Sequence, residues 1–242
     1  MVSKISTFTI SPSLGRGDDG AKNIEESIAL LDMLAENGTE IVVATPHFYS
    51  EENSISNFIK NRNDAYEKLK PHLKPNHPKI ILGAEVLYSP LLVGKELLYE
   101  LKIQGTDFVL LEMPYSELDD DIIDNVANIA NAMDLKLIIA HIERYLHFTS
   151  FRSLLKLMDL DVLGQINVKS LTRFSSKHAC FKLIKRGCVH AIGTDIHRVS
   201  RPVPFVKEAI EIIDKKFGDG FTESIMEKEK AILSNKDLDY FY

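Results

Sequence analysis

The sequence predicts an α/β fold in which about seven strand–helix units form a closed or nearly closed barrel. Short apolar runs rich in Val and Ile recur along the chain, and each run that ends in a polar residue is followed by a stretch with helical periodicity. Continuous apolar runs are typical of strands covered on both faces, as in a parallel sheet. The length of 242 residues suits a single domain, expected to span residues 1–242. An open doubly wound sheet is the alternative.

The predicted strands are separated by segments long enough to hold a helix. A first strand is expected at 5–10, and the others are expected at 40–47, 79–85, 107–112, 135–141, 163–167 and 189–195. Strands that alternate with helices in this way are typical of βα units with a parallel sheet.

Four of the intervening segments have the apolar spacing of amphipathic helices. They are 23–36, 120–133, 176–185 and 206–217. In the first of them, Ile24, Ile28, Leu31 and Ala35 fall on one stripe, which predicts the face that packs on the sheet. Gly38 follows that stripe, at a position where glycine is favoured as a helix ends.

Composition and charge exclude several classes of protein. Lys and Arg number 29 against 35 Asp and Glu, a net charge of −6, and no basic stripe suggests a nucleic-acid partner. No apolar run reaches the roughly 18 residues that cross a bilayer, so a membrane-spanning protein is not expected. The first residues lack the apolar core of a secretion signal, and two cysteines cannot form a disulfide scaffold. A cytoplasmic location is therefore expected.

Side chains of the kinds that bind metals stand at the predicted strand ends. They are His47, Glu85, Glu112, His141, Asp195 and, two residues further on, His197. The carboxyl ends of parallel strands meet at one end of such folds, so we expect these side chains to lie together. Imidazoles and carboxylates that share one cleft repel or lose solvation unless cations neutralise them. Mixed ligands of this kind favour Mn²⁺, Fe²⁺ or Zn²⁺, and their number favours two or three ions. Each residue alone is explained as well by a loop hydrogen bond or an ion pair, so the prediction depends on the joint pattern.

Two arginines each come shortly after a predicted metal ligand. Arg144 comes shortly after His141, and Arg201 comes shortly after His197. Guanidinium groups match phosphate oxygens, so metals flanked by arginines predict hydrolysis of a phosphate ester. Surface salt bridges are the alternative interpretation of each arginine taken alone.

On these residues the sequence resembles the polymerase and histidinol phosphatase (PHP) superfamily. Within it, the resemblance is to the metal-dependent bacterial tyrosine phosphatases that are encoded with capsule and exopolysaccharide genes. The matching segments are 18–22, 44–47, 83–85, 111–112, 140–145, 194–197 and 201–202, and the resemblance runs from about 18 to 232.

The resemblance implies a distorted barrel of seven βα units with up to three metals, commonly Mn²⁺. It implies that Asp19, His47 and His197 hold one metal and that Glu85, Glu112 and His141 hold another, with Glu85 bridging. Asp195 would join Glu85 at a third ion. Arg144 and Arg201 would bind the phosphate, and Asp19 is a candidate proton donor. The implied substrate is phosphotyrosine on the tail of a bacterial tyrosine autokinase that controls polysaccharide assembly. The metal's identity and the formation of a homo-oligomer stay open.

The chain departs from this family at its first strand. The family has a His-x-His motif there, whereas Ile10 and Pro12 occupy the corresponding positions. Neither side chain can bind a metal, so the third ion would have only Glu85 and Asp195. Three explanations stay open: an enzyme with two metals, an enzyme with a weakly held third metal, or a degenerate homologue that binds a phosphorylated partner without hydrolysing it. A PHP phosphatase of a small metabolite is a further alternative.

Overall fold

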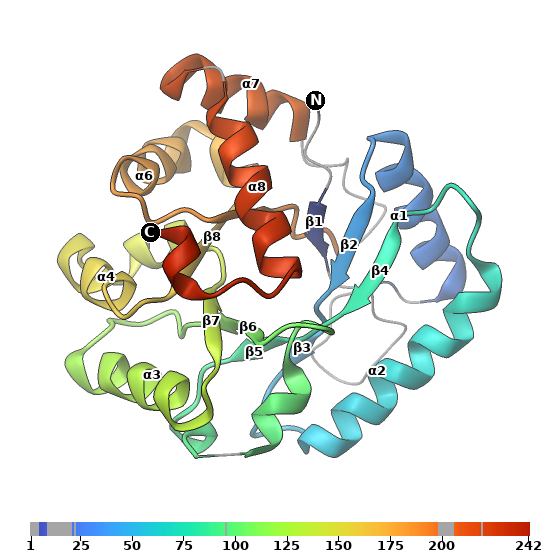
Figure 1. The fold of residues 1–242 in the computed structure, drawn as a ribbon, viewed down its shortest axis with the longest axis horizontal. Coiled ribbons are helices and arrows are strands. Elements are labelled where there is room, and N and C mark those ends of the chain that lie inside the picture. The colour runs from blue at the N-terminus through green and yellow to red at the C-terminus, as the bar shows by residue number, and fades with distance from the viewer. Residues whose placement is uncertain (1–4, 9–20, 22, 95, 198–205, 219) are drawn as a thin grey trace.

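The strands of this chain run parallel to one another and curl into a distorted barrel with helices around it (Figure 1). The computed structural model describes residues 5–8, 21, 23–94, 96–197, 206–218 and 220–242. Predictions about Ile10, Pro12, Asp19 and Arg201 lie outside the described residues.

In the part of the chain that the structure describes, nine strand segments make up two hydrogen-bonded sheets. The first sheet has the order β1-β2-β4, formed by Ile5–Phe8, Ile41–Ala44 and Lys79–Leu82. The second has the order β3-β5-β6-β7-β8-β9, formed by His47–Phe48, Glu85–Leu87, Phe108–Glu112, Lys136–Ile139, Leu163–Asn167 and Ala191–Gly193. Because β2 leads directly into β3 and β4 into β5, these segments amount to seven strands, as predicted, within the described residues. β9 also contacts β1, so the two ends of the curled sheet approach each other.

Two of the predicted strands are bent where the sequence expected them to continue. Pro46 interrupts the first, since proline has no N–H to donate to a ladder. Gly83 interrupts the second, where a Cβ would lie 3.2 Å from Cγ2 of Thr45. Backbone hydrogen bonds still join the strands across the bend, from Gly83 N to Ala44 O (2.8 Å) and from Glu85 N to Pro46 O (3.0 Å). The bend therefore turns the chain from one sheet to the other while the two strands stay paired.

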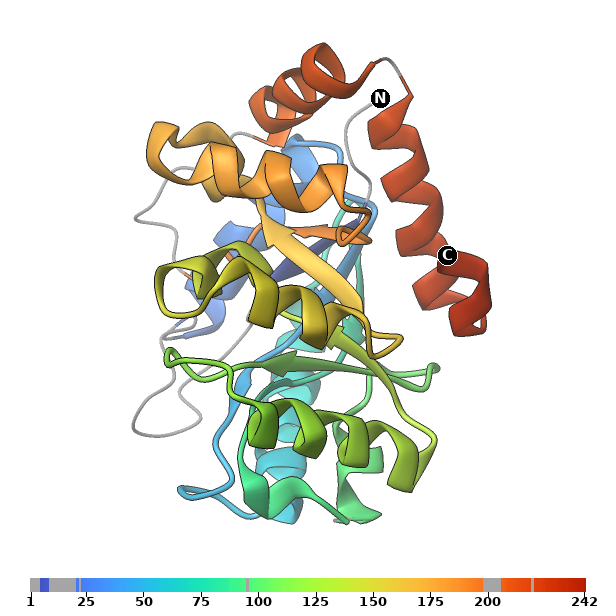
Figure 2. The ribbon, with the colours of Figure 1, turned by 90° about the vertical axis from the view of Figure 1, so that its left-hand side faces the viewer.

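Eight α-helices and several short 3₁₀ turns connect the described strands. The helices are α1 (Ile24–Glu36), α2 (Ile55–Leu69), α3 (Asp120–Met133), α4 (Phe151–Met158), α5 (Val168–Thr172), α6 (Phe174–Lys185), α7 (Val206–Phe217) and α8 (Phe221–Leu233). The 3₁₀ turns are η1 (Lys70–His72), η2 (Pro90–Leu92), η3 (Glu96–Leu101), η4 (Ile142–His147) and η5 (Leu238–Phe241). The predicted helices at 23–36, 120–133 and 206–217 are confirmed to within a residue, whereas α6 begins two residues before the predicted start. Figure 2 shows α3, α4 and α6 one above another along one side of the strands.

Side chains of the central strands alternate between the barrel interior and the helical layer. In β6, Phe108 and Leu110 belong to the interior cluster, while Val109 and Leu111 pack in the cluster that includes the helices. Alternation with period two then directs Glu112, the last residue of β6, to the same face as Leu110. The strand pattern alone therefore aims this carboxylate into the mouth of the barrel.

The amino end of the barrel is covered by α8 and the C-terminal residues. Phe241 packs edge-on against Phe108, with ring centroids 6.0 Å apart. The hydroxyl of Tyr242 donates to the carbonyl of Val162 (2.8 Å), just before β8. This cover leaves the carboxyl ends of the strands as the end at which a site can open.

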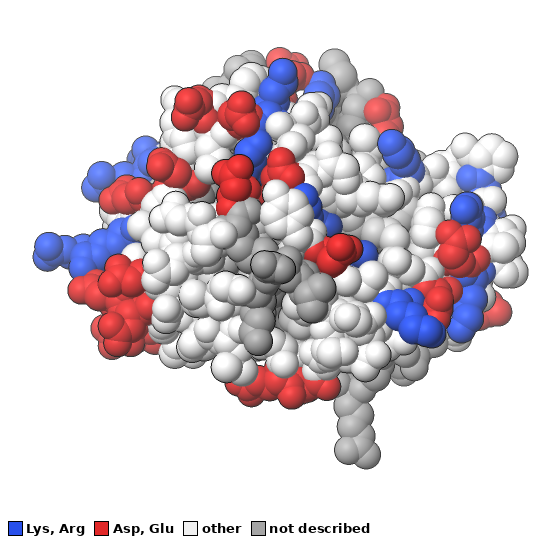
Figure 3. All heavy atoms as spheres, turned by 60° about the horizontal axis from the view of Figure 1, so that its bottom comes forward, with Lys and Arg blue, Asp and Glu red and all other residues white. Residues whose placement is uncertain are grey.

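Acidic and basic side chains are interspersed on the face shown in Figure 3. Among the residues that the structure describes, no helix combines the length and apolar character that a bilayer crossing requires.

Candidate metal centre and anion site

Three ligand-type side chains are brought together by neighbouring strands. His47 and Glu85 occupy paired positions on β3 and β5, and Glu112 ends β6 on the other side of β5. One ligand atom from each of these three residues lies within 4.8 Å of the others. Both carboxylates are buried, and His47 is half-buried. The three residues form a group able to hold a metal ion.

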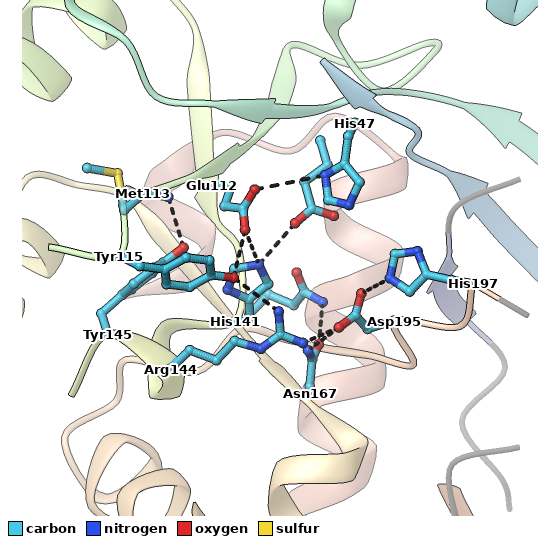
Figure 4. A network of polar contacts seen from close by, with 12 residues as sticks. His47, Glu112, Met113, Tyr115, His141, Arg144, Tyr145, Asn167, Asp195 and His197 are labelled. Atoms are coloured by element: carbon cyan, nitrogen blue, oxygen red, sulfur yellow. Dashed lines mark hydrogen bonds and ion pairs between the residues drawn. The ribbon is translucent and has the colours of Figure 1, made fainter. Parts of the chain in front are cut away.

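His141 completes this group from the end of β7, the strand that pairs with β6 on the side away from β5. It follows β7, and its Nε2 lies 3.0 Å from Oε1 of Glu85 and 3.3 Å from Oε1 of Glu112 (Figure 4). Burial by itself would lower the pKa of His141, but its hydrogen bonds to Glu112 and Glu85 raise that pKa to about 9. Burial likewise opposes ionisation of Glu112, yet the hydrogen bond from His141 lowers its pKa. Positive charge at this point is what keeps the buried carboxylate of Glu112 ionised.

The same residues fit a divalent cation. Carboxylate and imidazole atoms are the ligands that Mn²⁺, Fe²⁺ and Zn²⁺ accept, and they converge here from separate strands. Nδ1 of His141 is buried and has no hydrogen-bond partner within the described part of the chain. Two carboxylates buried this close to one another require a compensating positive charge, which a metal ion supplies as well as an imidazolium does.

A second group of polar side chains adjoins the first. Asp195 follows β9, and its Oδ1 lies 2.7 Å from Nε2 of His197. Its Oδ2 forms an ion pair with Arg144 and accepts a hydrogen bond from the side-chain amide of Asn167 (2.9 Å). Burial raises the pKa of Asp195, but the hydrogen bond with His197 and the charge of Arg144 outweigh it and hold that pKa well below its usual range. The rings of His47 and His197 are stacked with centroids 5.8 Å apart, so the two groups are continuous.

Tyr115 connects the two groups on the other side. Its hydroxyl donates to Oε1 of Glu112 (2.8 Å) and accepts from the guanidinium of Arg144 (3.3 Å) (Figure 4). Burial and the charge of Glu112 raise the pKa of Tyr115 to about 12, so the phenol stays protonated at neutral pH. Arg144 is thus positioned by a carboxylate and a phenol, while part of its side chain remains exposed.

Two residues of the site have left-handed backbone conformations. His141 has φ of 33° and Asp195 has φ of 51°. Few non-glycine residues adopt this region, aspartate and histidine more often than most, and such conformations cluster at functional positions. Both side chains are thereby turned toward the mouth of the barrel directly after their strands.

Glu143 supports the site from behind. This carboxylate is buried between η4 and α5, where its Oε1 accepts from Oγ of Ser170 (2.7 Å) and from the backbone N–H of Asn167 (3.3 Å). Burial raises the pKa of Glu143. The contact ties the segment that carries His141 and Arg144 to the end of β8.

The structure brings together seven of the residues that the sequence singled out. They are His47, Glu85, Glu112, His141, Arg144, Asp195 and His197, while Asp19 and Arg201 lie outside the described residues. The expectation that each ligand ends its strand needs correction for two of them, because His47 and Glu85 begin new segments after the bends at Pro46 and Gly83.

Sequence reasoning missed three residues that organise the site. Tyr115, Glu143 and Asn167 all contact predicted site residues or position the segments that carry them. Asn167 stands at a predicted strand end and had the same positional signal, but an amide is a weak metal ligand. Glu143 lies within the segment 140–145 that carries the resemblance, but nothing in the sequence gave it a role. No comparable signal marks Tyr115, because its role depends on how separate segments pack.

The fold and the site together define a parallel α/β barrel with a candidate metal centre at the carboxyl ends of its strands. A family model described as "Capsular polysaccharide synthesis, CpsB/CapC" matches residues 11–234. The chain therefore belongs to the CpsB/CapC family.

Curated relatives match nearly the whole chain. It is 27% identical over 235 residues to Tyrosine-protein phosphatase CpsB of Streptococcus agalactiae serotype III (strain NEM316), which covers 90% of this chain and 94% of that protein. It is 29% identical over 219 residues to Tyrosine-protein phosphatase CpsB of Streptococcus pneumoniae, covering 83% of this chain and 86% of that protein. It is 25% identical over 239 residues to Tyrosine-protein phosphatase YwqE of Bacillus subtilis (strain 168), covering 91% and 89%.

Solved structures share the fold. One comes from a study of YwqE from Bacillus subtilis and CpsB from Streptococcus pneumoniae, described as unique metal-dependent tyrosine phosphatases. It superposes with a TM-score of 0.78 at 20% identity and covers 96% of this chain and 95% of its own. A chain of archaeal ribonuclease P with mature tRNA superposes with a TM-score of 0.59 at 16% identity, covering 98% and 90%. At these identities the likeness concerns the fold alone.

Proposed function

We propose that this protein is a metal-dependent protein-tyrosine phosphatase that acts on a bacterial tyrosine autokinase of capsule or exopolysaccharide synthesis. The observation that carries the proposal is the contact between a cation-holding group and a guanidinium. Tyr115 joins Glu112 of the first group to Arg144 of the second. Curated relatives named tyrosine-protein phosphatases, which match most of the chain, support the same activity.

The proposed ligands divide between two ions, proposed as Mn²⁺ because the donors are imidazole and carboxylate. Glu85, Glu112 and His141 would hold one ion, with Glu85 reaching toward the other. His47 and His197, whose rings are stacked, would hold the second together with Asp19. Asp195 would contribute to a third position, which Ile10 and Pro12 leave short of ligands. When bound, such ions lower the pKa of a water molecule and polarise the phosphoryl group.

The chain's own side chains would bind and orient the ester. Arg144 would hold two phosphoryl oxygens through its planar fork, and Asp195 and Tyr115 keep that fork in place. Arg201 would add a second guanidinium. Hydrogen-bond donors would then already be in place around the phosphoryl oxygens. Preorganised donors of this kind stabilise the negative charge that develops in the transition state. A tyrosine leaving group departs without a strong acid because its pKa is about 10, and Asp19 is the proposed proton donor where one is used.

A cytoplasmic location is proposed from the state of the two cysteines. Cys180 and Cys188 are both free and buried. Unpaired thiols are typical of reducing compartments, which supports a cytoplasmic enzyme. The proposed partner is the phosphorylated tail of the kinase, because the family description and the relatives' names join capsule synthesis to tyrosine dephosphorylation.

The test is metal-stimulated release of phosphate from an aryl phosphate and from a phosphotyrosine peptide. The purified protein should contain divalent metal by elemental analysis, and added Mn²⁺ should increase the rate. His141→Ala removes the side chain between two buried carboxylates and should lower kcat/KM about a thousandfold. His178→Ala, at an exposed histidine of α6, is the matched control and should leave the rate unchanged. An H141A protein with wild-type activity would overturn the proposed site.

Non-catalytic binding is the second candidate, and Ile10 and Pro12 are the observation that favours it. It requires tight binding of a phosphotyrosine peptide with no turnover at any metal concentration. A panel that includes histidinol phosphate separates both candidates from a small-metabolite phosphatase, which should prefer its metabolite by orders of magnitude.

A further inference from the structure

Two aromatic side chains stand half-exposed beside Arg144. Tyr115 follows β6 and has 48% of its surface exposed, and Phe148 follows η4 and has 47% exposed. Their ring centroids lie 5.5 Å apart, and the ring planes are inclined by 42°. Arg144 lies on η4 itself and reaches the hydroxyl of Tyr115 at 3.3 Å. An apolar surface therefore adjoins the guanidinium of the anion site.

Tyr115 is held firmly by the site behind it. Its ring is stacked on His141 with centroids 6.3 Å apart and an interplanar angle of 22°. Its hydroxyl is bound by Glu112 and Arg144. The protein therefore covers one edge and one face of the Tyr115 ring. The exposed part of the ring lies next to Phe148.

The core beside the exposed rings of Tyr115 and Phe148 is already filled by another tyrosine. Tyr145 is fully buried, and its hydroxyl accepts a hydrogen bond from the backbone N–H of Met113 (2.9 Å). Tyr145 therefore fills the space between η4 and β6. The rings of Tyr115 and Phe148 add an apolar surface outside that core, where burial would be favourable only once a second apolar group covers them.

We propose that Tyr115 and Phe148 form an aromatic wall that receives the phenyl ring of the substrate and selects aryl over alkyl phosphate esters. The inference rests on the proposed function and names the residues that give its site a preference for phosphotyrosine. In phosphotyrosine the ring is joined to the phosphate through a single oxygen, so a phosphate held at Arg144 leaves the ring next to Tyr115. Phosphoserine has only a methylene at that point and gains nothing from an aromatic surface. Aromatic pairs prefer offset or inclined arrangements, and the tilt between Tyr115 and Phe148 offers one such surface.

Two phosphonates test the wall without any chemical step. Phenylphosphonate carries the ring and methylphosphonate does not, and neither can be hydrolysed at the carbon–phosphorus bond by a phosphatase. Their affinities for the manganese-loaded protein are measured by calorimetric titration. The wild-type protein should prefer phenylphosphonate, and Phe148→Ala should reduce that preference about fivefold while leaving methylphosphonate affinity unchanged.

Three further variants separate recognition from structure. Phe148→Tyr keeps the ring and should retain the preference, and Tyr115→Phe should do so although it loses the hydroxyl. Tyr240→Ala removes an aromatic side chain that is 54% exposed at the amino end of the barrel, and it should change neither affinity. An equal loss of both affinities in Phe148→Ala would assign Phe148 a structural role and overturn the wall, as would an unchanged preference.

The same titrations distinguish the wall from the phosphatase activity. A wild-type protein that releases no phosphate from aryl phosphates, yet loses its phenyl preference in Phe148→Ala, keeps the wall and overturns hydrolysis. A wild-type protein that hydrolyses aryl phosphates but shows no phenyl preference overturns the wall alone. A protein that binds neither phosphonate overturns both.

Discussion

At the carboxyl end of the barrel the ionisable side chains of the candidate metal centre touch one another, whereas the buried ionisable side chains near the amino end lie apart. Glu85, Glu112 and His141 share hydrogen bonds in one group. Near the amino end, Glu229 of α8 accepts only the backbone N–H of Ile192 at Oε1 (2.9 Å), and its Oε2 has no hydrogen-bond partner within the described residues. Both ends are similarly buried, so the difference lies in the partners.

The protonation of the two groups follows from these partners. Burial raises the pKa of Glu229 to about 8, so this acid is largely neutral at pH 7. Burial lowers the pKa of His190 to about 4, so this imidazole is also neutral. At the carboxyl end the hydrogen bonds between opposite charges outweigh burial, since the pKa of His141 is raised and that of Glu112 is lowered. A buried group thus stays charged only where its counter-charge is in contact with it.

The contrast between the two ends points to the carboxyl end as the candidate site, without reference to any relative. Isolated buried groups become neutral and act as polar parts of the core. Groups of like and opposite charge that converge on one point hold charge there, which is what cation and phosphate binding require.

The largest expected effect on stability concerns Glu229. The folded state holds the proton of Glu229 more tightly than the unfolded chain, so the stabilisation is complete at low pH and is lost as pH rises from about 4.5 toward 8. Glu229→Gln removes this loss. The stability of the variant relative to wild type should therefore increase by about 3 kcal/mol between pH 5 and pH 8, measured by denaturant unfolding. Glu223→Gln, at an exposed position of the same helix, is the control. If the unfolding free energies of wild type and E229Q change in parallel between pH 5 and pH 8, the pKa of Glu229 is not raised by burial and the prediction is wrong.

A smaller effect of opposite direction is expected for His190. Its folded-state pKa lies below the usual 6.5, so its contribution is present above about pH 6.5 and is lost as pH falls toward 4. Wild type should lose about 2 kcal/mol relative to His190→Gln between pH 7 and pH 5 in the same unfolding assay. His178→Gln, at an exposed histidine, should leave the profile of wild type unchanged. If wild type and H190Q keep a constant difference across this range, the histidine is paired rather than isolated.

The smallest effect probes the contact between charges at the carboxyl end. Arg144→Lys keeps the positive charge but loses the fork that contacts both Asp195 and Tyr115. The variant should lower kcat/KM for an aryl phosphate about tenfold, mostly through KM. Arg152→Lys on α4 is exposed and serves as the control. Equal activity of R144K and wild type would mean that charge alone, without planar recognition, suffices at the anion site.

Much of the fold could be predicted from the sequence because its signals are local. Apolar runs specified β6 and β8, and apolar periodicity specified α3 and α7, almost to the residue. The interruptions at Pro46 and Gly83 were not predicted, because each strand was expected to continue to the ligand-type residue that follows, His47 or Glu85. Their effect depends on how β2 and β4 pair with their neighbours.

The candidate site divides in the same way. Ligand types at strand ends identified His47, Glu85, Glu112 and His141, because a parallel barrel brings strand ends together whatever the intervening sequence. The side chain of Asn167 was overlooked, since an amide becomes significant only when Asp195 lies 2.9 Å away.

The sequence by itself determined the class of fold, the end of the barrel that carries the site and the chemical types gathered there, because strand alternation and strand ends are properties of neighbouring residues. Only the tertiary structure decided which groups share protons, which stay neutral, and that Tyr115 and Phe148 adjoin Arg144. These outcomes depend on distances between segments far apart in the chain, and electrostatic and aromatic contacts fall off within a few ångströms.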